Sequence, residues 1–316
     1  MSKNAFCSPK RIILGVAFLL AIVFPFLAPY TALASEVLIF IIFAMAYDLV
    51  LGYTGMLSFG HAVFFGLGAY GTGIVLTRVY PSVLVGLLSG VVISTVAAYL
   101  IGYLSIRRSG IYFTMVTLAL AQMVYFIAFK WTGLTGGDDG LQNIPRPHLG
   151  SVNLQSEISL YYFILFFAIL TLIILLRVVN SPVGKTLQAL KENKDRALSI
   201  GYDIGKFKLI AFVISGLFCG LAGGLYALLL NFVPVSSLHW ATSGDIVIMT
   251  IVGGMGTLFG PAIGAAAIIL LRDIISNFTE SWSTIMGLLF MGSVLGFRGG
   301  IVGVFQARYH ALVKGP

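Results

Sequence analysis

Charged residues are scarce in this sequence. Asp, Glu, Lys and Arg make up 9% of its 316 residues, whereas soluble domains carry roughly a quarter. Hydrophobic residues make up 59%. This balance excludes a water-soluble fold, because too few polar side chains are present to cover the surface of one.

Cysteine is also rare, since only Cys7 and Cys219 occur. A framework of paired cysteines is therefore lacking, and we expect both residues to be small packing residues rather than a disulfide.

A complete nucleotide-binding motif is missing too. Gly184, Lys185 and Thr186 resemble the end of a phosphate-binding loop, but that pattern requires glycine where this chain has Val179. The segment 66–71 spells G-x-G-x-x-G, yet it lies in an apolar run with no strand before it. We therefore expect no cofactor in this chain. If ATP drives it, another subunit must hydrolyse the ATP.

Long apolar runs dominate what is present. Several approach the roughly 20 residues that cross a bilayer, and they include 12–26, 37–50, 83–101, 160–176 and 209–230. They are apolar all round and too long for barrel strands. The sequence predicts an all-α integral membrane protein, with residues 1–316 forming one transmembrane domain of about ten helices. We interpret the first run as a retained span, since no cleavage site followed by a soluble domain is found.

The basic residues predict the orientation of the chain. With ten spans, all of the 19 Lys and Arg residues except Arg78, Lys130, Arg146 and Arg272 fall on one side. That side is cytoplasmic by the positive-inside rule, so both termini are expected inside a bacterial cytoplasmic (inner) membrane. Segment 245–275 could form one long span or two short spans broken at glycines, and only two spans give ten. Because the basic residues are scattered through loops, nucleic acid is not an expected partner.

Two polar loops separate the apolar runs, an extracytoplasmic one at 131–158 and a cytoplasmic one at 180–207. The outer loop carries Asp138 and Asp139 in a turn-rich acidic cluster. Further oxygen ligands would have to converge there to hold a metal, so we expect no metal site. A solvated loop and a docking surface for another protein are the alternatives.

The inner loop predicts a short amphipathic helix. Ser181 and Pro182 suit an N-cap and a first turn, apolar residues then recur at helical spacing among charged ones, and Gly201 suits the C-terminal end. Such a helix could lie on anionic lipid. It could also act as a lever that a cytosolic motor grips.

Two glycine-rich stretches resemble each other, since 52–60 reads GYTGMLSFG and 253–260 reads GGMGTLFG. Paired broken segments point to a translocation site, because unwound backbone in a membrane is tolerated only where it is buried or lines a cavity. They also suggest two pseudo-symmetric halves, although chance similarity is an alternative in a chain with 37 glycines. The residues that we expect along the pathway are Tyr53, Ser58, His61, Gly253, Gly256 and Thr257.

Ionisable residues within spans are expensive and therefore suggest function. The candidates are Asp48, His61, Asp245, Arg272 and Asp273. An interfacial or helix-capping role is the alternative for Asp48 and Asp245, and a structural role for His61. No paired relay of the kind that proton-coupled carriers use is found among them.

In combination, these stretches resemble the branched-chain amino acid ABC transporter permeases of the LivM type, over roughly residues 37–303. The matching motifs are LVLGYTGMLSFGHAVFFGLGAYG at 49–71, RRSGIYFTMVTLALAQ at 107–122, TGGDDGL at 135–141, SPVGKTLQALKENKDRALSIGYD at 181–203 and IVGGMGTLFGPAIGA at 251–265. One departure is Asp48, a position at which the family often has Asn.

The resemblance implies a non-catalytic permease subunit of an importer for branched-chain or related amino acids. Its partners would be a second LivH-like permease, two cytosolic ABC ATPases that bind ATP and Mg, and a periplasmic or surface-tethered substrate-binding protein, for which Asp138 and Asp139 are candidate contacts. The inner loop would be the coupling helix, and its ATPase-coupling residues would be Gly184, Ala189, Leu190, Glu192, Asp195, Ala197 and Gly201.

Two other functions fit a polytopic helical chain. A secondary carrier or channel for a small polar solute such as urea or an amide would act alone, without need of the amphipathic inner helix. A lipid-embedded assembly subunit would need no paired broken spans.

Overall fold

The described part of the chain is almost entirely helical. The computed structural model describes residues 22–25, 27–147, 153–193, 197–198, 201–279, 281, 284–285, 287–288, 291–292, 300–301 and 303. The helices are α2 (Thr31–Thr54), α3 (His61–Ile74), η1 (Val75–Val79), α4 (Val83–Ser105), α5 (Ile111–Lys130), α6 (Thr132–Thr135), η2 (Gly137–Asp139), α7 (Glu157–Asn180), α8 (Pro182–Glu192), α10 (Ile204–Leu230), η3 (Val235–Leu238), α11 (Trp240–Gly253) and α12 (Phe259–Ser276).

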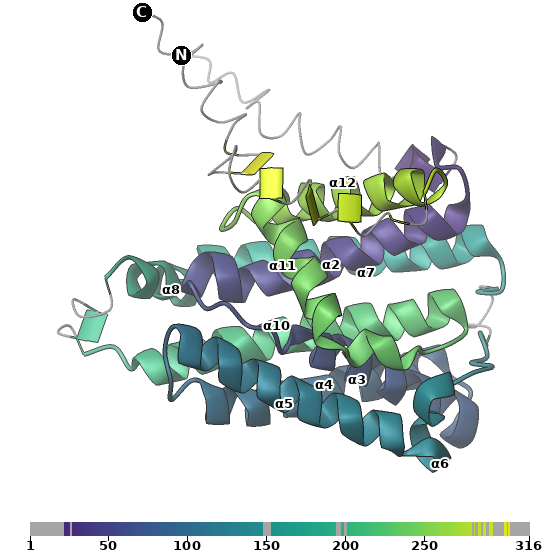
Figure 1. The fold of residues 1–316 in the computed structure, drawn as a ribbon, viewed down its shortest axis with the longest axis horizontal. Helices are drawn as coiled ribbons and strands as arrows, with labels where there is room; N and C mark the ends of the chain where they lie inside the picture. The colour runs from purple at the N-terminus through teal and green to yellow at the C-terminus, as the bar shows by residue number, and fades with distance from the viewer. Residues whose placement is uncertain are drawn as a thin grey trace, which may run out of the picture.

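The expected multi-pass helical membrane fold is confirmed. Within the described residues, seven helices are long and apolar enough to cross a membrane, with α3 and η1 counted as one, and α11 is a shorter apolar helix of 14 residues. Most of them run side by side across Figure 1, with α8 at the left end and α6 at the right. The expected count of ten is approximate, because most of the first run and most of the chain after 279 lie outside the described residues.

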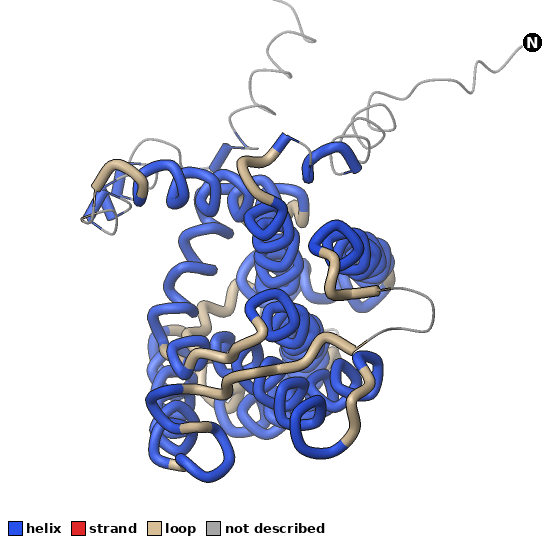
Figure 2. Tube along the Cα trace, turned by 90° about the vertical axis from the view of Figure 1, so that its right-hand side faces the viewer, coloured by secondary structure: helices blue, strands red, loops and turns tan. Residues whose placement is uncertain are grey.

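Helix α2 forms the centre of the bundle. Of the most apolar 18-residue stretch of α2, 94% is buried. Helix α2 packs against α7, α10 and α12. Figure 2 views the long helices nearly end-on. The ring of Phe43 stacks on that of Phe65 with centroids 4.8 Å apart, which joins α2 to α3. An apolar helix that is buried on every side reads as core rather than as a lipid-facing stripe.

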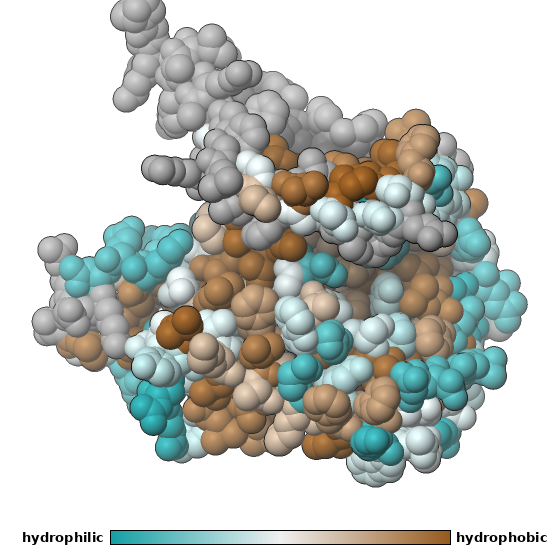
Figure 3. All heavy atoms as spheres, in the orientation of Figure 1, coloured by the Kyte–Doolittle hydropathy of each residue, from teal (hydrophilic) through white to brown (hydrophobic). Residues whose placement is uncertain are grey.

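The outer helices present apolar side chains to the surroundings. Only 22% of the most apolar 18-residue stretch of α5 is buried inside the protein, and only 28% of the corresponding stretch of α7. Hydrophilic residues gather at the left and right ends of Figure 3, with hydrophobic residues between them. This distribution is typical of a protein whose middle lies in hydrocarbon.

Glycines bring α3, α4 and α10 into close contact. A Cβ on Gly68 would lie 2.2 Å from the carbonyl oxygen of Gly220, and one on Gly220 would lie 2.3 Å from the Cβ of Ser94. The Ser94 hydroxyl donates to the Gly216 carbonyl oxygen at 2.7 Å. Small residues allow such approach in lipid, where no hydrophobic force drives helices together. The G-x-G-x-x-G segment is therefore a packing surface.

All four basic residues that were expected on the outer side lie at the end opposite α8, where Lys130 ends α5 just before α6. Arg78 donates to the carbonyl oxygen of Gly133 in α6 at 2.8 Å, and Arg146 to that of Leu228 near the end of α10 at 2.6 Å. Arg272 pairs with Glu36, near the start of α2, at 2.5 Å. The membrane side that each end faces stays a prediction.

The close approach of α3 and α10 is testable at Gly223. A Cβ there would lie 1.8 Å from the carbonyl oxygen of Phe65, which is backbone and cannot rotate away. Gly223→Leu should therefore lower the thermal unfolding midpoint of the purified protein, at a cost on the order of 3 kcal/mol. Gly133→Ala is the control, since its Cβ meets nothing within 4 Å. Equal midpoints for the two variants would contradict this packing.

Candidate functional site

The first glycine-rich stretch interrupts two helices inside the bundle. Helix α2 ends at Thr54 and α3 begins at His61. Gly55 adopts the left-handed conformation with φ of +73°, and its N–H donates to the Leu51 carbonyl oxygen at 3.2 Å. Glycine takes this conformation without steric cost, which makes it the common residue after a helix end.

Side chains satisfy the backbone between these helices. The N–H of Ser58 donates to the Tyr47 hydroxyl at 3.3 Å, and that hydroxyl donates to the Ser58 carbonyl oxygen at 3.1 Å. The hydroxyl of Thr114 donates to the carbonyl oxygen of Leu57 at 2.8 Å. An unpaired backbone group in hydrocarbon costs several kcal/mol, so these contacts allow a non-helical segment at this position.

The second stretch also forms a break. Helix α11 ends at Gly253 and α12 begins at Phe259, which confirms a break at the glycines within 245–275, while two separate spans there stay a prediction. Gly254 and Gly256 have φ of +118° and +80°. Leu258 has φ of +56°, a value that is uncommon for a residue with a side chain.

The two breaks share a capping device. The Ser58 hydroxyl oxygen accepts the N–H of Gly60 at 3.2 Å, and the Thr257 hydroxyl oxygen accepts that of Gly260 at 2.9 Å. In each stretch the hydroxyl belongs to the residue two or three positions before the final glycine. The sequence similarity of the two stretches thus has a structural counterpart.

The two breaks meet at Asp48. One carboxylate oxygen accepts the N–H of Gly256 at 2.8 Å and the other that of Leu258 at 3.2 Å. A Cβ on Gly52 would lie 2.4 Å from the Gly256 nitrogen, so the backbones touch. We call Asp48, Gly52 and residues 254–258 the glycine junction. Sequence reasoning found both stretches but missed this use of Asp48, whose signal was its departure from Asn.

Helix α8 is joined to the glycine junction. The Nζ of Lys191 donates to the carbonyl oxygen of Gly52 at 2.7 Å. The expected amphipathic helix is confirmed at Pro182–Glu192, with the Ser181 hydroxyl as its N-cap, but its C-cap is Asn193 rather than the expected Gly201. Leu190 packs with Ala197 and Ile204 in a small apolar cluster, which ties the inner loop to the first turn of α10.

The expected coupling residues divide into buried and exposed sets. Gly184, Leu190 and Ala197 are buried, and Ala189, Glu192 and Gly201 are exposed. A Cβ on Gly184 would lie 2.1 Å from the carbonyl oxygen of Val179, so this glycine permits α8 to fold back on α7. Asp195 lies outside the described residues.

The expected pathway residues lie at or beside the two breaks. Gly253, Gly256 and Thr257 belong to the second break. Beside the first break, Tyr53 is buried near the end of α2, with 4% of its surface exposed. His61 is fully buried, and its Nε2 lies 3.1 Å from the Ser215 hydroxyl. Their roles in transport stay predictions.

The His61 imidazole has a defined hydrogen-bonding pattern. The Ser215 hydroxyl donates to the Ala46 carbonyl oxygen at 2.6 Å, so its proton is used and the His61 Nε2 must carry the donated hydrogen. The ring of His61 meets those of Tyr47, Phe64 and Phe212 edge to face. Within the described residues, His61 therefore joins α2, α3 and α10 as a core residue.

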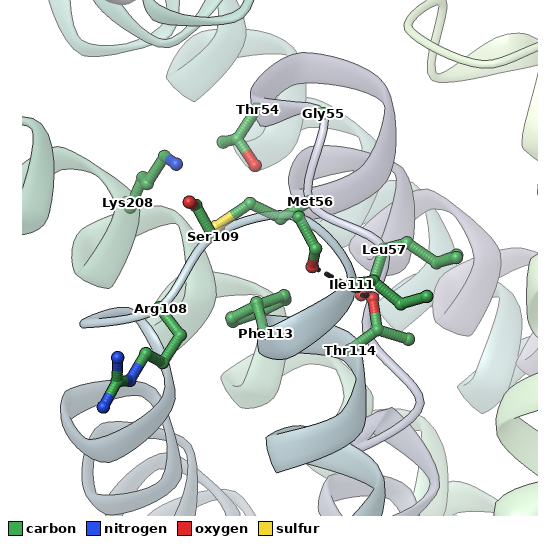
Figure 4. A pocket seen from close by; sticks show the side chains of 11 residues that line it. Thr54, Gly55, Met56, Leu57, Arg108, Ser109, Ile111, Phe113, Thr114 and Lys208 are labelled. Carbon is green, nitrogen blue, oxygen red and sulfur yellow. Dashed lines mark hydrogen bonds between the residues drawn. The ribbon is translucent and has the colours of Figure 1, made fainter.

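A pocket of about 430 Å³ lies beside the first break. Figure 4 shows Met56 and Phe113 in it, and the hydrogen bond from Thr114 to Leu57. Arg108 and Lys208 also line it, and the start of α5 adds the positive end of its helix dipole. Sequence reasoning missed this basic pocket, because its residues come from three separate segments.

The outer loop is attached to the end of α10. Leu141 and Val233 exchange backbone hydrogen bonds of 3.0 and 2.8 Å. Asp138 and Asp139 lie in η2 with exposed side chains. Among the residues that the structure describes, no group of three potential metal-ligating side chains occurs. The use of these aspartates in docking stays a prediction.

Interrupted helices that meet inside a bundle of membrane-length helices are typical of multi-pass transport proteins. A family profile described as "Branched-chain amino acid transport system / permease component" matches residues 30–297. The chain belongs to this family, the permease subunits of ABC importers. The resemblance to LivM-type permeases is thereby confirmed.

Curated relatives agree with the family. The chain is 28% identical over 310 residues to "High-affinity branched-chain amino acid transport system permease protein LivM" of Salmonella typhimurium, covering 88% of this chain and 71% of the relative. It is 21% identical over 286 residues to a probable LivM of Methanocaldococcus jannaschii, covering 80% and 83%. It is 27% identical over 239 residues to "Autoinducer 2 import system permease protein LsrC" of Enterobacter sp., covering 72% and 66%. No solved structure matches the chain.

The Asp48 carboxylate should stabilise the glycine junction. Asp48→Leu would remove both acceptors and leave two backbone N–H groups unpaired, at about 1–3 kcal/mol for each. Asp48→Asn retains one acceptor oxygen and should cost less. The thermal unfolding midpoint should therefore fall in the order wild type, Asp48→Asn, Asp48→Leu. A leucine variant as stable as the wild type would show that the carboxylate does not hold the second break.

Proposed function

We propose that this chain is the non-catalytic membrane subunit of an importer that takes up branched-chain or related amino acids across the bacterial cytoplasmic membrane. A second, LivH-like permease would pair with it, and a match of 31% identity over 122 residues to a probable LivH supports such pairing of related chains. Two cytosolic ABC ATPases would bind the ATP and Mg. A binding protein would deliver substrate to the end opposite α8, with Asp138 and Asp139 as candidate contacts.

The observation that carries this proposal is the hydrogen bond from Lys191 on α8 to Gly52 in the glycine junction, 2.7 Å long. ATP is hydrolysed outside the membrane, so an importer needs an element on the cytosolic side that transmits motion to the pathway. A ligand shifts an equilibrium only through different contacts in the two states. Helix α8 can make such contacts with the ATPases through its exposed face, and it can pass the resulting motion on because it touches the junction directly.

The geometry of α8 supports its role as the coupling helix. Ala189 and Glu192 are exposed and available to an ATPase, whereas Leu190 is 5% exposed and packs on Ala197 and Ile204. Motion imposed on the exposed face would therefore pass to α10 through the apolar cluster and to the junction through Lys191. In this proposal both termini and α8 are cytoplasmic, as the distribution of basic residues predicts.

The names of the relatives support the substrate class. The LivM relatives are named for branched-chain amino acids, and the LsrC relative for autoinducer 2. The LivM relative of Salmonella typhimurium matches 88% of this chain and the LsrC relative 72%. We therefore propose an amino acid with an aliphatic side chain.

The coupling role is tested by ATP hydrolysis in liposomes that contain this chain, its partner permease, the ATPases and the binding protein. Gly184→Asp places a side chain against the Val179 backbone, and Leu190→Glu places a charge in the apolar cluster. Both variants should assemble but lose stimulated hydrolysis and uptake. Lys191→Met, which keeps the stem and removes the ammonium, should hydrolyse ATP with uptake reduced on the order of 10-fold, the effect of a charged hydrogen bond.

Lys206→Gln is the control for the lysine variant. Lys206 forms an exposed pair with Asp203 at 3.2 Å, and such pairs contribute little, so hydrolysis and uptake should match the wild type. If this chain took up substrate without the ATPases, and none of these substitutions changed that uptake, the importer proposal would be contradicted and a carrier or channel would be indicated.

A further inference from the structure

Asp245 is an acidic residue of α11 that the structure does not use as a helix cap. Helix α11 begins at Trp240, and its N-cap is His239. No acidic residue lies in the first turn of α11, so Asp245 is too far along the helix to meet its free N–H groups. The capping alternative for Asp245 is thus wrong.

Asp245 lies at the depth of the membrane interior. Two residues before it, the Ser243 hydroxyl oxygen accepts the N–H of Ala62, the second residue of α3, at 2.8 Å. The neighbouring His61 ring packs on Tyr47 of α2 with centroids 4.7 Å apart. Tyr47 is about 10 Å from the inner end of α2 and about 24 Å from its outer end, at 1.5 Å per residue. Asp245 is therefore inside the hydrocarbon layer rather than at its edge.

The Asp245 side chain is exposed on the surface of this chain. Among the described residues, no hydrogen bond or ion pair reaches its carboxylate. Arg272 is itself paired with Glu36 at 2.5 Å. An ionised carboxylate cannot face lipid tails without a large cost, so in its charged form Asp245 needs a partner beyond the described residues.

The surface around Asp245 combines polar and aliphatic groups. Figure 3 shows white and teal residues among the brown ones in the middle of the face that α11 crosses in Figure 1. Further along α11, at helical spacing, the partly exposed Ile248 and Val252 lead to the exposed Met255 at the second break. A carboxylate is thus followed by aliphatic side chains and then by the glycine junction.

We propose that Asp245 binds the α-ammonium group of the amino acid during its passage, while Ile248 and Val252 contact the aliphatic side chain. This deepens the proposed function and rests on it. A carboxylate is complementary to an ammonium group and gives a charge-assisted hydrogen bond. The other occupant, a lysine or arginine of the partner permease, would bind Asp245 permanently, whereas a passing amino acid also accounts for the aliphatic surface that leads from Asp245 to the glycine junction.

The test uses the full complex in liposomes, with uptake of L-leucine and of its 2-hydroxy acid analogue, which has the same side chain but no ammonium. Asp245→Asn keeps the size of the side chain and removes its charge. L-Leucine uptake should fall on the order of 10- to 100-fold, with assembly and ATP hydrolysis unchanged and with any preference for the amine over the hydroxy acid lost. Asp245→Glu should restore part of the uptake.

Glu157→Gln is the matched control, because Glu157 is an exposed carboxylate at the start of α7. It should leave uptake and amine preference at the wild-type level. Loss of the partner permease on purification of Asp245→Asn would overturn the proposal in favour of a cation on that partner, and wild-type uptake by this variant would also overturn it. Failure of the wild-type complex to take up L-leucine with ATP would count against the proposed function instead.

Discussion

Every backbone N–H and C=O that leaves a helix inside the bilayer must find a partner within the protein, because hydrocarbon offers none. This constraint explains the polar side chains of the bundle interior. The Tyr47 hydroxyl serves both backbone groups of Ser58, and the Asp48 carboxylate holds two N–H groups of the second break. The breaks exist only because these side chains are in place.

The same constraint joins the breaks to the cytosolic helix. The carbonyl oxygen of Gly52, a residue of the junction, accepts a hydrogen bond from the ammonium group of Lys191 on α8. Glycine is needed at Gly52 because any Cβ would collide with Asp48 and with the backbone of Gly256. In the function that we propose, this contact makes α8 and the junction move together, so that ATP-driven motion reaches both broken stretches at once.

Much of this architecture could be predicted from sequence, because hydrophobic runs and helix signals are local. Ser181 and Pro182 begin α8 as expected, and the break within 245–275 lies at its glycines. The contact between Asp48 and Gly256 could not be predicted, since it joins residues 208 positions apart. His61 was expected near the pathway, yet it is surrounded by aromatic rings from other helices, and local sequence does not show those neighbours.

The central claim is that α8 and the glycine junction stay in contact through the transport cycle. A Cβ on Gly55 would lie 3.4 Å from the Lys191 side chain, so cysteines at these two positions can be joined by a short thiol crosslinker in a background without Cys7 and Cys219. The double-cysteine complex lacks the Lys191 ammonium and should start on the order of 10-fold below wild-type uptake, so the measurement is its ATP-driven uptake before and after complete crosslinking. The account predicts unchanged uptake. Abolished uptake that returns when the crosslink is cleaved would show that α8 separates from the junction, and would contradict it.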